Sequence, residues 1–198
     1  MNSRSLALAA LVLAGSIAAS SGEDRPKKAV VGEPVPNFRM RDVMKDDEVL
    51  TSLAQFKGKT VVLFFVSDKC QVTWAYERRT GKLISDFRKD VVFLGVKSSA
   101  GDSADEIKSY CEQKNFDIPV LCDDRNVVAD FFGFRSTPQY AVIDKDGILR
   151  YSGAFDDLQS PQKFRAKEET AKEQYVRAAL EAVLAGKEVP TKTAKGYG

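Results

Sequence analysis

Six consecutive apolar residues, Val61 to Val66, constrain the fold more than any other feature of this 198-residue chain. The run is rich in β-branched and aromatic side chains and contains no polar residue. A strand with one solvent-exposed face alternates apolar and polar residues, so an unbroken apolar run is typical of a strand that is buried on both faces. Such a strand needs covering layers on each side. The run therefore predicts the centre of a layered α/β sheet.

The rest of the chain alternates between helical and strand-like patterns. Helices are expected over about 72–87, 102–114, 126–132 and 167–185, and strands or short apolar segments over 91–96, 118–121, 140–143 and 148–151. Lys145-Asp146-Gly147 separates the last two strands and is a hairpin signal. Parallel strands separated by helices, followed by an antiparallel hairpin, indicate a three-layer α/β fold with a central mixed sheet and flanking helices.

The first residues have the pattern of a signal peptide. Arg4 precedes the apolar stretch from Leu6 to Ala19, small residues follow, and the sequence then turns polar at Gly22. The apolar stretch is short for a membrane span, so export to the periplasm or the extracellular space is expected, with no membrane insertion after processing. The predicted organisation is a signal peptide over 1–21, an extended segment over 22–34, one domain over 35–189 and a loose tail over 190–198.

Composition excludes several classes of function. The chain has no histidine, which removes histidine-based triads and the usual zinc, copper and haem ligands. Three cysteines are too few for a four-cysteine metal site, so no metal and no cofactor are expected. The net charge is +2, and positive and negative residues are interspersed along the chain. The sequence therefore shows no basic patch of the kind that binds nucleic acid. The acid pairs Asp123-Asp124 and Asp156-Asp157 are interpreted as solvated turn residues.

Cys70 lies where the central strand should end and the next helix should begin. The free N–H groups and the positive dipole end of a helix stabilise a thiolate, which is the form that attacks disulfides and peroxides. Lys69 is expected to add a positive charge. The alternative is a buried, unreactive cysteine.

The order of these features resembles the thioredoxin superfamily, and within it the exported redoxins of the alkyl hydroperoxide reductase/thiol-specific antioxidant group. The resemblance covers about 31–189 and rests on Val35-Pro36-Asn37-Phe38, the 53–59 stretch, Cys70, Ser136-Thr137-Pro138, 142–147 and 151–157. It implies a three-layer thioredoxin-like fold and a thiol-dependent oxidoreductase or peroxidase that acts through Cys70. It also implies a cis Thr137–Pro138 loop that faces the cysteine and binds an extended partner chain.

The resemblance assigns further site residues and shows departures from the family. Ser67 keeps a hydroxyl where peroxiredoxins have threonine, whereas Leu63 replaces their proline and Pro138 replaces their arginine, with Arg135 nearby. Thr73 stands where a dithiol enzyme has its second cysteine.

Two further residues extend the candidate site. Trp74 is a candidate for a substrate groove near Cys70, together with Tyr76 and Phe64, although aromatic residues beside a central strand are also typical of core. Cys111 resembles the resolving cysteine of atypical two-cysteine thiol peroxidases. Packing under the sheet is the alternative for Cys111.

Two functions follow from this sequence. The first is an exported redoxin that acts on a thiol, disulfide or peroxide substrate through Cys70 and is reduced by an external thiol. The second is a binding module that has lost catalysis and keeps the Pro138 groove.

Overall fold

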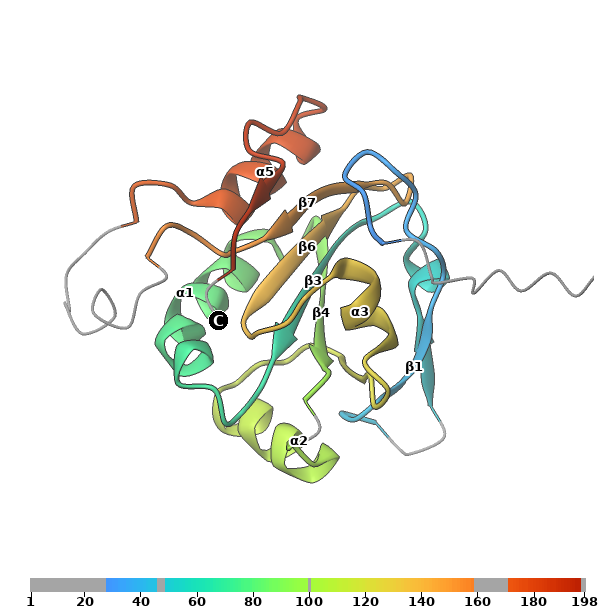
Figure 1. The fold of residues 1–198 in the computed structure, drawn as a ribbon, viewed down its shortest axis with the longest axis vertical. Helices are drawn as coiled ribbons and strands as arrows, with labels where there is room; N and C mark the ends of the chain where they lie inside the picture. The colour runs from blue at the N-terminus through green and yellow to red at the C-terminus, as the bar shows by residue number, and fades with distance from the viewer. Residues whose placement is uncertain (1–27, 46–48, 100, 159–170, 197–198) are drawn as a thin grey trace, which may run out of the picture.

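The computed structural model describes residues 28–45, 49–99, 101–158 and 171–196, which form one mixed sheet with helices on both faces (Figure 1). Along the sheet the strand order is β2-β1-β5-β4-β3-β6-β7-β8. The strands are β1 Arg39–Asp42, β2 Leu50–Ser52, β3 Thr60–Val66, β4 Val91–Lys97, β5 Val120–Cys122, β6 Gln139–Ile143, β7 Leu149–Gly153 and β8 Thr193–Ala194. The helices are η1 Leu53–Phe56, α1 Gln71–Phe87, α2 Ala104–Gln113, α3 Val127–Phe132 and α5 Tyr175–Leu184.

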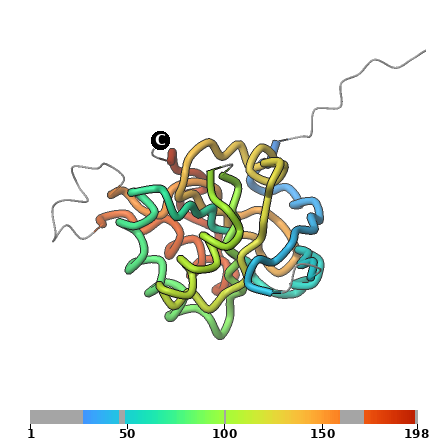
Figure 2. Tube along the Cα trace, turned by 90° about the horizontal axis from the view of Figure 1, so that it is seen from below, coloured from blue at the N-terminus to red at the C-terminus, as the bar shows by residue number. Residues whose placement is uncertain are grey.

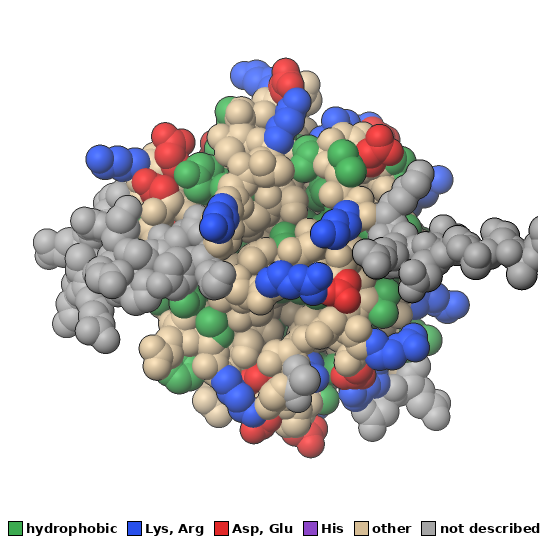
Figure 3. Space-filling model, in the orientation of Figure 1, with side chains coloured by type: hydrophobic (Ala, Val, Ile, Leu, Met, Phe, Trp, Pro, Cys, Tyr) green, Lys and Arg blue, Asp and Glu red, His purple; other side chains and the backbone are tan. Residues whose placement is uncertain are grey.

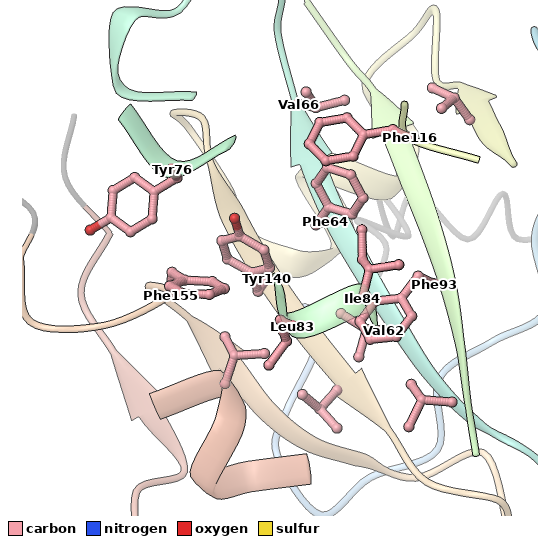
Figure 4. Packing of buried hydrophobic residues seen from close by; sticks show 14 of the residues in the cluster. Val62, Phe64, Val66, Tyr76, Leu83, Ile84, Phe93, Phe116, Tyr140 and Phe155 are labelled. Carbon is pink, nitrogen blue, oxygen red and sulfur yellow. The ribbon is translucent and has the colours of Figure 1, made fainter. Parts of the chain in front are cut away.

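Strand β3 is the centre of the sheet, as its sequence predicts. It pairs in parallel with β4 and antiparallel with β6, and all seven of its residues are buried. Val62 and Phe64 face the layer formed by α1, α2 and α5 (Figure 4), whereas Leu63 and Phe65 face α3, η1 and the N-terminal segment. The predicted three-layer architecture is therefore confirmed.

The predicted helix over 167–185 begins later than expected. Residues 171–174 are not helical, and 167–170 lie outside the described residues. The backbone N–H of Asp157 donates to the Glu173 carbonyl, and the Asp157 carboxylate accepts from the N–H groups of Lys172 (3.0 Å) and Glu173 (3.3 Å). These contacts hold residues 172–173 in a non-helical connection to Asp157, and α5 begins at Tyr175.

The termini are more ordered than the sequence indicated. Within the tail expected to be loose, Thr193–Ala194 forms β8 and pairs in parallel with β7. Within the expected extended segment, residues 31–33 form a turn, and the segment is bound to the sheet, because Gly32 donates to the Leu149 carbonyl and Pro34 forms a bridge to Ile148. Strands β1 and β2 carry no apolar run, so periodicity did not reveal them.

Two acids that were expected to be solvated are buried instead. The carboxylate of Asp123 accepts from the backbone N–H groups of Val128 and Ala129 and so stabilises the start of α3. Asp156 accepts from the Tyr76 hydroxyl at 2.8 Å and pairs with Arg79. The interpretation as solvated turn residues was wrong for both.

Lys/Arg and Asp/Glu side chains are interspersed on the face shown in Figure 3. No helix of the described residues is both long enough and apolar enough to cross a membrane. The predicted signal peptide over 1–21 lies outside those residues.

Helix α5 should pack against the sheet through Leu180, whose side chain is fully buried. We expect Leu180→Ala to lower the free energy of unfolding by about 2–5 kcal/mol, because a buried cavity is left behind. Leu184→Ala on the same helix, where the side chain is exposed, is the matched control and should cost less than half as much. Urea denaturation measures both, and equal losses in the two variants would contradict this placement of α5.

Candidate functional site

Cys70 is the N-cap residue of α1 and is partly exposed. Strand β3 ends at Val66, and three residues later the chain turns into the helix, where the Cys70 carbonyl accepts from the N–H of Trp74 at 3.2 Å. The Cys70 side chain therefore lies at the positive end of a 17-residue helix, as the sequence predicts.

The Cys70 thiol contacts the loop between α3 and β6. The Thr137–Pro138 peptide bond is cis, as expected. The thiol donates to the Thr137 carbonyl, with 3.0 Å between Sγ and the oxygen. The fold thus brings Cys70 to the Thr137–Pro138 loop, although Cys70 and Thr137 are 67 residues apart in the chain.

The positive charge expected from Lys69 is directed elsewhere. Its ammonium group donates to the Gly101 carbonyl and to Glu106, with 3.2 Å from Nζ to Oε2. Hydrogen bonds from Ser103, together with the Lys69 ammonium, lower the pKa of Glu106 to about 2. Lys69 therefore ties the loop before α1 to the loop before α2, and the expectation that its charge serves Cys70 was wrong.

The two hydroxyl residues assigned to the site are both buried. Ser67 accepts from the backbone N–H of Lys69 at 3.3 Å. Thr73 lies on the first turn of α1, and its Oγ1 has no hydrogen-bond partner among the described residues. Thr73 therefore fills the position of a second thiol without making a polar contact of its own.

The three aromatic candidates have different environments. Tyr76 and Phe64 are core residues, so the groove interpretation does not hold for them. Trp74 is 50% exposed, and its indole N–H donates to the Asp68 carbonyl at 2.6 Å. It borders a depression of about 630 Å³ between α1 and α2, and Cys70 is not among the residues that line this depression.

A second depression of about 350 Å³ lies on the other side of the cis-proline loop. Ser67, Thr137 and Arg135 all line it, so the structure brings these three predicted residues together. The guanidinium of Arg135 pairs with Asp130 and both side chains are substantially exposed. The depression therefore borders the cis-proline loop, and the one arginine among its lining residues is already paired.

Sequence reasoning missed two facing carboxyl groups, Asp68 and Asp102, from the loops that follow β3 and β4. Asp102 is 3% exposed, and none of the described residues donates to either of its carboxyl oxygens or to Asp68 Oδ1. Burial and the adjacent Asp102 carboxyl raise the pKa of Asp68 above its usual value. The only sequence signal was that both acids follow buried parallel strands, whose carboxyl ends share one edge.

The other two cysteines are buried, and all three thiols are free. Burial raises the pKa of Cys111 to about 12, with smaller contributions from Glu112 and Asp68. Cys122 donates to Asp124 at 2.9 Å and packs in the core, as expected of a structural residue. A resolving role for Cys111 stays a prediction.

The raised pKa of Asp68, which lies beside the Asp102 carboxyl, predicts a pH-dependent stability. A carboxyl whose pKa is raised by folding stabilises the protein below its unfolded pKa of about 3.9, and this contribution is lost as the pH rises through the folded value. We expect Asp102→Asn to be increasingly more stable than the wild type as the pH rises from about 4 to 8. Asp105→Asn, an exposed neighbour, is the control. Parallel curves of unfolding free energy against pH for wild type and Asp102→Asn would contradict the pair.

Known proteins resemble this chain over the region that builds the site. Peroxiredoxin Q from rice (Oryza sativa subsp. japonica) is 28% identical over 141 residues, covering 63% of this chain and 58% of that protein. The thiol-disulfide oxidoreductase ResA of Bacillus cereus is 25% identical over 141 residues, covering 69% and 79%. An exposed lipoprotein thioredoxin from Streptococcus pneumoniae superposes with a TM-score of 0.54 at 25% identity, covering 74% of this chain and 99% of that one.

The chain spans less than two thirds of the length of peroxiredoxin Q. The AhpC/TSA family matches residues 31–152, a stretch that contains Cys70 and the cis-proline loop. Three layers around a mixed sheet, with a thiol at the start of α1, agree with that match. This chain is therefore a member of the AhpC/TSA family with a thioredoxin-like fold.

Proposed function

We propose that this chain is an exported thiol-dependent oxidoreductase in which Cys70 exchanges with disulfides of extended partner chains. The observation that carries the proposal is the contact between the Cys70 thiol and the Thr137 carbonyl, next to cis Pro138. A partner chain that pairs with the backbone at Thr137 would bring its own sulfur to Cys70 by strand addition. The similarity to a thiol-disulfide oxidoreductase supports the same chemistry.

The step is a thiol–disulfide exchange. The Cys70 thiolate attacks one sulfur of the substrate disulfide, a bond from Cys70 Sγ to that sulfur forms, and the other substrate sulfur leaves as a thiolate and takes up a proton. An external thiol then attacks the mixed disulfide and restores Cys70. The second step must come from outside because Thr73 occupies the place of a nearby thiol.

Disulfides fit the site better than peroxides. Polarising a peroxide needs a cation or another free donor beside the thiol. Lys69 is bound to Glu106 and Gly101, and Arg135 is bound to Asp130. Thiol exchange needs only an accessible sulfur and a bound partner, and the partly exposed N-cap position of Cys70 supplies the first.

Cys111 would change this scheme if it resolved the oxidised Cys70. Its thiol is buried on α2 and its pKa is raised to about 12, so attack on Cys70 would require local opening of α1 or α2. We therefore propose single-cysteine exchange as the main route.

The proposed export rests on the sequence pattern of residues 1–21. The similarity to an exposed lipoprotein thioredoxin supports an extracytoplasmic setting. Disulfide-bonded partners persist in such compartments, which fits a substrate of this chemical class.

A catalytically inactive binding module is the second candidate. Thr73 in place of a second thiol and the pairing of both nearby cations favour it. Such a module would bind an extended chain at the Pro138 groove and leave Cys70 unmodified.

Oxidised glutathione distinguishes the two candidates. We expect the reduced wild type to accumulate a mixed disulfide on Cys70, and Cys70→Ser to form none, as measured by peptide mass spectrometry. In Thr73→Cys the introduced thiol should displace glutathione and release it, so the mixed disulfide should fall at least tenfold. The buried Thr73 hydroxyl has no hydrogen-bond partner among the described residues, so this variant should fold.

Thr73→Ser is the matched control and should accumulate the mixed disulfide like the wild type. Failure of both the wild type and Thr73→Cys to react with the disulfide would support the binding module instead.

A further inference from the structure

The described end of the chain returns to the thiol site. After α5 the chain runs beside β7, where the N–H groups of Ser152 and Ala154 donate to the carbonyls of Lys192 (3.2 Å) and Ala194 (3.1 Å). Because β8 is parallel to β7, the residues that follow it continue toward the edge at which β6 starts. Figures 1 and 2 both place this end of the chain next to the loop between α3 and β6.

Two glycines allow the tail to lie this close. A Cβ atom on Gly153, whose φ is +144°, would lie 1.9 Å from the Ala194 carbonyl oxygen. A Cβ atom on Gly196 would lie 2.6 Å from Nε2 and 2.8 Å from Cδ of Gln139. Any larger residue at position 196 must therefore displace either the tail or the Gln139 side chain. We refer to Thr193–Gly196 as the C-terminal clasp.

Gln139 connects the clasp to the thiol. It follows cis Pro138 directly and is 9% exposed. Its side-chain amide donates to the Ser136 hydroxyl at 2.9 Å and so spans the loop that contains Thr137. The Thr137 carbonyl in turn accepts from the Cys70 thiol. A continuous set of contacts thus runs from Gly196 through Gln139 and the loop to Cys70.

We propose that the C-terminal clasp is a positioning element for the thiol site. By lying against Gln139 it keeps the Gln139–Ser136 hydrogen bond in place, and this bond holds the Thr137 carbonyl against Cys70. The clasp lies outside the stretch 31–152 that matches the family. The proposal rests on the proposed role of Cys70 as the reacting thiol.

Alkylation of Cys70 tests the clasp without requiring any turnover. Loss of the thiol–carbonyl hydrogen bond should raise the rate of alkylation by iodoacetamide at pH 7 by about 2- to 10-fold. We expect this rise in Gly196→Ala, and in a full-length chain shortened by residues 193–198. Lys195→Ala, at an exposed clasp position, is the matched control and should react like the wild type.

The buried thiols Cys111 and Cys122 separate positioning from general loosening. Peptide mass spectrometry should show faster alkylation at Cys70 only, and the pH profile of that reaction should shift with it. An unchanged Cys70 rate in Gly196→Ala would overturn the proposal, and so would an equal rise at all three cysteines. If the shortened chain fails to fold, the alkylation rate of Cys70 in Gly196→Ala tests the proposal by itself. Inactivity of the wild type toward disulfides would contradict the proposed function but would leave this alkylation result standing.

Discussion

Burial of β3 on both faces is the constraint on which the rest of this structure depends. All seven residues are buried, so the strand must run through the middle of the sheet with a helical layer on each side. The strand emerges from the core at Ser67, and the next residues must turn directly into α1. That turn places Cys70 at the start of a long helix, and the antiparallel pairing of β6 with β3 brings Thr137 alongside it.

The charges near Cys70 are engaged in holding loops together. Lys69 joins the loops before α1 and α2, Arg135 is paired on the surface, and burial together with the adjacent Asp102 raises the pKa of Asp68. The helix N-terminus and the Thr137 carbonyl are therefore the groups that contact Cys70 most directly. This arrangement suits exchange with a disulfide that a bound partner presents, and it offers little to polarise a peroxide.

Local patterns predicted the parts of the structure that local forces determine. Strand burial, helix ends and X-Pro dipeptides each leave a signal within a few residues of sequence. The sequence therefore predicted the buried strand that begins near Val61, the position of Cys70 at the start of a helix, and the Thr137–Pro138 loop. The start of α5 was not, because Asp157 binds Glu173 from a distant loop. The meeting of Asp68 with Asp102, and of Gly196 with Gln139, depends on sheet order, which no single segment encodes.

The central claim is that Cys70 reacts and does so without a second thiol of this chain. Treating the reduced protein with one equivalent of a disulfide-linked peptide, then mapping every cysteine by mass spectrometry, tests the claim most directly. The account predicts the peptide on Cys70, with Cys111 and Cys122 still free. A disulfide between Cys70 and Cys111, or a peptide-free Cys70, would contradict it.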